Sequence, residues 1–148
     1  MKKSVVLTIA IIYIVAVVAV GVFGISVRIP EQIVYVDKIT CVSDGYKSYE
    51  DNQDKLALGY DGYISKTYSK GLKVVIQCAI NPIDATNGDL IYIYDESRSD
   101  VYTVEVRPDG TAVVSFHQSG SAIITIKAAD SKGVSTKIEI YAFENPFE

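Results

Sequence analysis

The feature that most constrains this chain is the segment Val5–Val27, which contains no charged residue. Lys2 and Lys3 precede it, and Arg28 follows it at once. A helix of that length rises roughly 34 Å, enough to cross a hydrocarbon core about 30 Å thick. In lipid the backbone must satisfy its own hydrogen bonds, which favours a helix even in a segment rich in Ile and Val. The segment therefore predicts a single transmembrane helix in contact with the lipid bilayer.

The charges around this segment predict its orientation. Two lysines at the N-terminus favour a cytoplasmic N-terminus, which would place the rest of the chain outside the cytoplasm. We therefore expect cytoplasmic lysines and a transmembrane signal-anchor helix over residues 1–28, and a connector over 29–32 where Pro30 stops the helix. The predicted location is the cell membrane, as a single-pass protein with an extracytoplasmic C-terminal domain.

Two other interpretations of the apolar segment stay open. It could be a secretory signal peptide cleaved near Ile25, because the small residues Gly21 and Gly24 could frame a cut there. The apolar part of a signal peptide usually runs about 7–15 residues, and this segment is longer. A buried helix of a soluble protein would normally show a polar face, and this segment has none.

Residues 33–148 have the length and composition of one β domain. They are enough to bury a hydrophobic core. The chain carries a net charge of −4, and its Lys and Arg residues are scattered, so the basic patch that nucleic-acid binding requires is lacking. Gly, Tyr, Thr and Val are abundant, and no long helical pattern follows the first segment. This mixture favours an all-β domain.

Alternating apolar residues and regularly spaced turn signals predict a β-sandwich. The clearest case is Leu72–Ile80, where one parity is apolar and Asn81-Pro82 ends the strand. Arg107–Gly110 has the composition of a hairpin turn. Short strands at such spacing are typical of a sandwich rather than of βαβ units. The expected strands are Ile33–Val42, Leu72–Ile80, Leu90–Tyr94, Val101–Val106, Thr111–Phe116, Ser121–Ala129 and Val134–Tyr141.

The segment 43–71 is the least regular part of the domain, and we expect an irregular loop and hairpin there. Asp61-Gly62 supplies the positive φ angles of a tight turn, so Lys55–Tyr60 and Tyr63–Thr67 are predicted to pair as a hairpin. Ser43–Asp54 is interpreted as an exposed loop with solvated charges.

The stretch from Lys70 to Tyr141 contains, in this order, Gly71, Asn81-Pro82, Ala85-Thr86-Asn87, Val101-Tyr102-Thr103-Val104, Asp109-Gly110, Gly120-Ser121-Ala122 and Ile124-Thr125. Through these residues it resembles the bacterial immunoglobulin-like domain, group 2. The resemblance implies an all-β, immunoglobulin-like β-sandwich that here follows a single N-terminal transmembrane helix. It also implies adhesion or spacing at a bacterial cell surface. Where the family usually offers a tryptophan to the core, this chain has Tyr92 or Tyr94.

Cys41 and Cys78 are the two cysteines of the chain. Outside the cytoplasm a disulfide between them can persist, and it would stabilise the domain by roughly 3–4 kcal/mol on the chain-entropy model. Both residues share the parity of core-facing neighbours, so two small buried thiols are an equal alternative.

Five tyrosines gather in the first third of the domain. Exposed tyrosine beside Ser, Gly and Asn is the composition of adaptable binding loops, so these residues are candidate binding-loop aromatics. The alternative is that several of them pack beneath the loop as a satellite cluster. They are Tyr46, Tyr49, Tyr60, Tyr63 and Tyr68.

No motif in the chain predicts an enzyme, a cofactor or a metal site. His117 is the sole histidine and lies beside a turn, so we expect it at the surface rather than in a catalytic triad or metal site. Calcium could bind at two acidic clusters, but neither has a recognised ligand spacing, and solvated loops are the simpler interpretation. The clusters are Asp95, Glu96 and Asp100, and Glu50, Asp51 and Asp54.

The function expected from the sequence is therefore non-catalytic. We predict a membrane-anchored extracytoplasmic module that serves binding, adhesion or spacing through an unidentified surface protein or glycan. The alternative is a structural subunit of a larger envelope or filament assembly, held through its apolar N-terminal helix. Gly21 and Gly24 would allow close approach of helices there, although they do not form the usual small-residue repeat.

Overall fold

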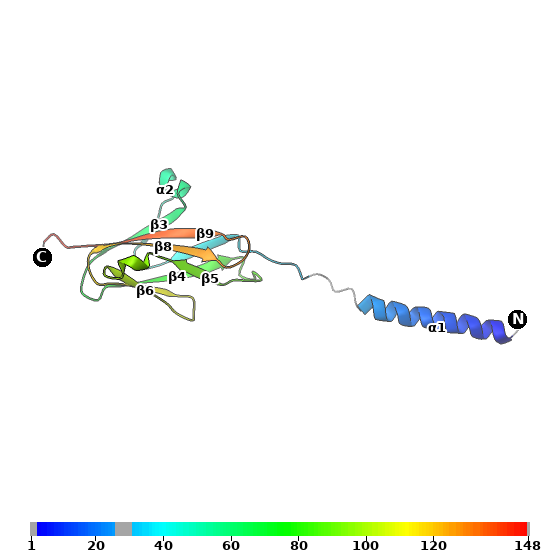
Figure 1. Ribbon diagram of the computed structural model, residues 1–148. Helices are drawn as coiled ribbons and strands as arrows, with labels where there is room; N and C mark the ends of the chain where they lie inside the picture. Colours follow the sequence, from blue (N-terminus) through cyan, green and yellow to red (C-terminus); the bar gives the residue numbers. More distant parts are fainter. Residues whose placement is uncertain (1–2, 26–30, 148) are drawn as a thin grey trace. The chain divides into compact units, whose positions relative to one another are not determined.

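The computed structural model describes residues 3–25 and 31–147. The chain forms two compact units, residues 1–32 and 33–148. The first unit contains one helix, α1 (Lys3–Ile25), and the second contains the strands (Figure 1). Lys2, Pro30 and the first half of the expected connector lie outside the described residues.

The transmembrane prediction for the first unit is wrong. In the part of the chain that the structure describes, no helix combines the length and apolar character needed to cross a membrane. The predicted fold class is corrected on this point.

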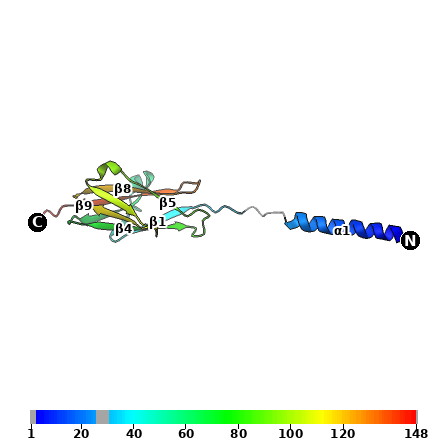
Figure 2. The same ribbon diagram turned by 60° about the horizontal axis from the view of Figure 1, so that its bottom comes forward.

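The second unit consists of two β-sheets packed face to face (Figures 1 and 2). The four-stranded sheet has the order β1-β4-β7-β6, and the five-stranded sheet has the order β2-β3-β9-β8-β5. All neighbouring strands are antiparallel except β3 and β9, which run parallel. The strands are β1 Lys38–Val42, β2 Tyr46–Ser48, β3 Tyr60–Thr67, β4 Lys73–Asn81, β5 Leu90–Ile93, β6 Tyr102–Val106, β7 Ala112–Phe116, β8 Gly120–Ala128 and β9 Ser135–Phe143.

The core lies between the two sheets, where alternate residues of each strand meet. Ile76 of β4, Ile124 of β8 and Ile138 of β9 are fully buried there, as the period-two pattern requires. Tyr92 of β5 faces inward as well, and its hydroxyl donates a 2.6 Å hydrogen bond to the carbonyl of Gly110. A smaller aromatic thus fills this place in the core and satisfies its polar end.

The segment before β3 differs from the expected hairpin. Asp61 and Gly62 lie inside β3, where the register with β9 shifts between Tyr60 and Gly62, so the predicted tight turn there is wrong. The chain instead reverses between β2 and β3 through the short helix α2 (Gln53–Ala57). Gly62 is needed for packing, because a Cβ at this position would lie 2.3 Å from the carbonyl oxygen of Lys47.

Candidate functional site

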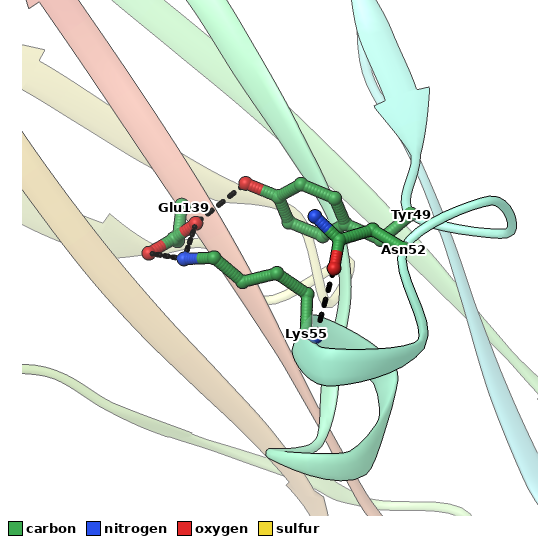
Figure 3. A network of polar contacts seen from close by, with 4 residues as sticks. All are labelled: Tyr49, Asn52, Lys55 and Glu139. Atoms are coloured by element: carbon green, nitrogen blue, oxygen red, sulfur yellow. Dashed lines mark hydrogen bonds and ion pairs between the residues drawn. The ribbon is translucent and has the colours of Figure 1, made fainter.

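Glu139 is the centre of the most extensive polar network in the described domain. It lies on the outer face of β9, because its neighbours Ile138 and Ile140 point into the core. In a sheet that faced water this carboxylate would be exposed, yet only 7% of Glu139 is accessible. The segment from Tyr49 to Gly59, which includes α2, supplies the side chains that contact it (Figure 3). The irregular segment therefore acts as a cover on the outer face of the five-stranded sheet.

Two side chains of this cover bind the buried carboxylate directly (Figure 3). The Tyr49 hydroxyl donates a 2.6 Å hydrogen bond to Oε2 of Glu139. The Lys55 ammonium lies 2.9 Å from both carboxylate oxygens. Asn52 caps α2 by accepting a hydrogen bond from the Lys55 backbone N–H, which fixes the start of the turn that carries Lys55.

Aromatic rings surround the same lysine. Lys55 Nζ lies 4.7 Å from the ring centroid of Tyr60 and 5.5 Å from that of Tyr49, within the range of cation–π attraction. The Tyr49 and Tyr63 rings pack with centroids 5.0 Å apart. The network therefore joins β9, β3 and the cover through charge, hydrogen bonds and ring contacts.

The protonation states of the network follow from these contacts. Burial raises the pKa of the Glu139 carboxyl, but the hydrogen bonds from Tyr49 and Lys55 outweigh burial and leave this pKa below its usual value. Burial first, and then the bond to the carboxylate, raise the pKa of the Tyr49 hydroxyl. The bond to Glu139 raises the pKa of Lys55. At neutral pH the site holds a carboxylate, an ammonium and a neutral phenol.

The five candidate tyrosines are all half-buried. Tyr46 donates a 2.6 Å hydrogen bond to Asp61, and Tyr68 donates one of 2.6 Å to the carbonyl of His117. Tyr49, Tyr60 and Tyr63 belong to the network around Glu139. The structure thus brings three of the five together and directs the hydroxyls of Tyr46, Tyr49 and Tyr68 to partners within the domain, as in a satellite cluster.

The structure joins Cys41 and Cys78 in a disulfide. The two residues lie directly opposite each other on β1 and β4, with their Cα atoms 4.1 Å apart, and both face the core. The bond closes a loop with a sequence separation of 37 residues, which contains the whole cover.

The remaining candidate residues have structural partners or lie in exposed turns. His117 is exposed, and its Nε2 lies 3.2 Å from the Thr103 hydroxyl. Asp95 caps a short 3-10 helix, η1 (Glu96–Arg98). Across residues 3–25 and 31–147, no three His, Cys, Asp or Glu side chains gather where they could hold a metal ion. The acidic residues Glu50, Asp51, Asp54, Glu96 and Asp100 are all exposed.

Several hollows open on the described surface of the domain. One, of about 700 Å³, lies where the end of β4, the start of β5 and the β6–β7 turn meet; Ile80, Tyr92 and Arg107 are among its lining residues. A second, of about 490 Å³, lies at the other end of the four-stranded sheet and is lined by Tyr68, Lys70, Gly71, Lys73, Thr103, Ser115, Phe116 and His117.

The outer face of the five-stranded sheet also carries an exposed apolar stripe, which the sequence interpretation missed. Its members come from three neighbouring strands and are between 36% and 51% accessible. A stripe of this kind on a sheet face is typical of a contact surface. The signal was present in Leu90–Ile93, where both parities are apolar although one faces outward. The stripe consists of Ile91, Ile93, Ile123, Tyr141 and Phe143.

Comparisons with known proteins give only distant similarities. No protein-family model matches the chain, and no curated protein matches it. Among solved structures it is similar to the S-layer protein rSbsC(31-844), with 18% identity and a TM-score of 0.40 over 72% of this chain and 13% of that one. It is also similar to domains 4 and 5 of the S-layer protein SbsC, with 17% identity and a TM-score of 0.33 over 70% and 54% of the two chains. The chain thus spans a small part of the first protein and about half of the second.

Proposed function

We propose that residues 33–148 form a non-catalytic module that works outside the cytoplasm by binding a surface partner and by spacing. The observation that carries this proposal is the Cys41–Cys78 disulfide within the core. Disulfides persist in oxidising compartments and are rare in the reducing cytosol. A bond that ties β1 to β4 and closes the loop around the cover favours a domain that matures outside the cytoplasm.

The strand order supports an immunoglobulin-like assignment within this proposal. The four-stranded order β1-β4-β7-β6 corresponds to strands A-B-E-D of an immunoglobulin sandwich, and β9-β8-β5 corresponds to G-F-C. β3 then adds a strand alongside β9, and the cover is an insertion between the first strand and β3. The resemblance to the bacterial group 2 domain is consistent with this order and extends the proposal to adhesion or spacing at a bacterial surface.

The apolar stripe supports protein contact as the mode of binding. Isolated exposed apolar residues are common on soluble domains, but these five lie on three adjacent strands, where Ile93, Ile123 and Tyr141 are diagonal neighbours. The neighbouring Tyr60 and Tyr63 add aromatic surface at the edge of the cover. Such a surface resembles the apolar centre and aromatic content of protein interfaces.

The location is tested in intact cells that make the full chain. Protease added outside should remove residues 33–148, and thiol alkylation before reduction should leave Cys41 and Cys78 unlabelled. Complete protection of the domain from protease, together with two freely alkylated thiols, would contradict an extracytoplasmic module.

The contact surface is tested with full-length variants. Ile93→Asp combined with Ile123→Asp should abolish capture of surface proteins from cell extracts while the thermal midpoint changes little, because both side chains are about half exposed. Val42→Asp combined with Val75→Asp, on the outer face of the other sheet, is the matched control and should leave capture unchanged. Equal capture by the wild type, the stripe variant and the control variant would show that the stripe is not the contact surface.

A second candidate function is a structural subunit of an envelope or filament assembly. The observation that favours it is α1, whose side chains at Val5–Val18 are all exposed and almost all apolar. A helix that is apolar on every side needs other apolar surfaces around it. Other copies of the helix could supply them, with Gly and Ala in the sequence permitting close approach.

The two candidates differ in oligomeric state. An assembly subunit should sediment as a large complex, and replacing Ile9, Ile12 and Val15 of α1 with Ser should reduce it to smaller species. A monomer at every concentration tested would exclude the assembly and favour the non-catalytic binding module.

A further inference from the structure

The 490 Å³ hollow has a defined position on the outer face of the four-stranded sheet. Lys73 of β4, Ser115 of β7 and Thr103 of β6 lie in one cross-strand row, since Ser115 is in register with both of the others. Side chains opposite each other in antiparallel strands are neighbours. His117 lies two residues beyond Ser115 on the same face, and Lys70 joins from the loop before β4. Five polar or charged side chains therefore converge from three strands and one loop.

The hollow is electropositive in a protein whose net charge is −4. Its lining includes the ammonium groups of Lys70 and Lys73 and no carboxylate. Ion pairs in the described chain engage Lys55, Lys66 and Lys132, and leave these two lysines without an acidic partner. The larger hollow differs, because Arg107 shares it with Asp89 and Asp109. A concave surface lined by charge of one sign concentrates ions of the opposite sign.

The loop and the imidazole of this hollow are held in place. Leu72 N–H donates to the Ser69 carbonyl, and Phe116 N–H donates to the Leu72 carbonyl, each at 2.9 Å, which anchors the loop that carries Lys70. Tyr68 donates a hydrogen bond to the His117 carbonyl, and the Thr103 hydroxyl lies 3.2 Å from His117 Nε2. The Ser115 hydroxyl has no hydrogen-bond partner among the residues that the structure describes, and is available to a ligand.

We propose that this hollow binds the anionic oxygen group, carboxylate or phosphate, of an acidic saccharide. Lys70 and Lys73 would neutralise the charge, and the hydroxyls of Ser115 and Thr103 would bond to its oxygens and to sugar hydroxyls. An open, shallow site with several hydroxyls and an aromatic neighbour, Tyr68, suits a saccharide. The proposal deepens the proposed surface-binding function, on which it rests, by naming a second class of partner at a site separate from the apolar stripe.

Isothermal titration of the full chain tests the proposal with three probes. Oligogalacturonate carries carboxylates, a phosphorylated dextran oligomer carries phosphates, and a neutral dextran oligomer of equal length carries no charge. At least one acidic probe should bind and the neutral one should not. The acidic probe that binds identifies which oxyanion the site prefers. Binding by neither acidic probe, with the protein folded, would overturn the proposal.

Matched charge variants separate a site from general attraction. Lys70→Ala with Lys73→Ala should weaken binding of the acidic probe at least tenfold. Lys47→Ala with Lys127→Ala makes the same change in net charge at exposed positions of the other sheet and should weaken it less than twofold. Ser115→Ala should weaken binding severalfold with no change in charge. Equal losses in the two lysine pairs, or tighter binding of duplex DNA than of either acidic saccharide, would overturn the proposal.

The titration tests the saccharide site independently of the protease experiment, which tests the location of the domain. If protease removes the domain from intact cells and the acidic probes do not bind, the proposed surface function is supported and the proposed saccharide site is contradicted. If the domain is protected inside the cell, the surface function fails even when a probe binds in solution, and the natural ligand is then not a surface saccharide.

Discussion

Glu139 shows how a single residue sets the local structure of its surroundings. On the exposed face of a sheet a carboxylate needs only water, but here Tyr49 and Lys55 take the place of water and bring the chain between β2 and β3 down onto the sheet. The partners lie 90 and 84 positions away in sequence. Sequence periodicity cannot detect such pairs, because the alternation of β9 predicts an ordinary solvated Glu139. That distance is why the sequence leaves both interpretations of the five tyrosines open, as binding-loop aromatics or as a packed satellite cluster.

The Glu139 network predicts a loss of stability in acid. Because the folded-state pKa of Glu139 is lowered, the carboxylate contributes stability above its unfolded value of 4.5, and this contribution disappears as pH falls through the folded-state pKa. The thermal midpoint should therefore fall as the pH drops below 4.5. Glu139→Gln should be less stable at pH 7, by about 1–3 kcal/mol, and should show a flatter pH profile. Parallel profiles for the two proteins would show that other carboxylates govern acid unfolding.

Reduction of the Cys41–Cys78 disulfide should destabilise the sandwich without changing its topology. Closing a loop with a separation of 37 residues restricts the unfolded chain, and reduction should lower the free energy of unfolding by about 3–4 kcal/mol. Urea unfolding with and without dithiothreitol measures the difference. The double variant Cys41→Ala with Cys78→Ala should show the same free energy of unfolding with and without dithiothreitol. It therefore controls for effects of the reductant elsewhere.

At the scale of elements, the strands from β4 to β9 could be predicted and the cover could not. The expected range Leu72–Ile80 differs from β4 by one residue at each end, and Thr111–Phe116 differs from β7 by one residue at its start, because buried alternation and turn residues agree there. Asp61-Gly62 has the composition of a turn, yet it continues β3, since β9 offers a parallel partner that local sequence does not reveal. The glycine serves close packing against β2 rather than a reversal of the chain.

Gly62→Ala should separate β2 from β3. The added methyl group would lie 2.3 Å from the Lys47 carbonyl oxygen and 2.5 Å from the Tyr46 ring, so the backbone of β2 must move, at a cost of about 1–3 kcal/mol. Amide exchange should accelerate at Tyr46 and Lys47. Gly88→Ala is the control, because its methyl would meet the mobile end of the Ile80 side chain, and exchange in β2 should stay as in the wild type.

For the whole molecule, the organising feature is the position of β9 between β3 and β8. It pairs with β8 along almost its full length and with β3 from Tyr60 to Thr67. It also carries Glu139, so the cover depends on it as well. One C-terminal strand thus connects the sheet, the disulfide-closed segment and the polar network.

A chain that ends at residue 134 should therefore lose far more than one strand. Without β9, the β2–β3 pair is no longer hydrogen-bonded to the rest of the five-stranded sheet. We therefore expect loss of the cooperative thermal transition and rapid proteolysis throughout the domain. A chain that ends at Phe143 removes only the exposed tail and should melt within a few degrees of the full chain. Protection of the β4–β7 half in the shorter chain would show that the two sheets fold separately.

The parallel pairing of β3 with β9 also has a consequence for synthesis. The ribosome delivers Tyr60 well before Lys137, its partner across the sheet, and the early strand must wait while the intervening chain is made. During that interval its apolar side chains and unpaired backbone groups are accessible to chaperones or to other nascent chains. The yield of folded domain should therefore depend on how well the incomplete nascent chain avoids aggregation. The yield should improve when translation of the last strand, β9, is fast.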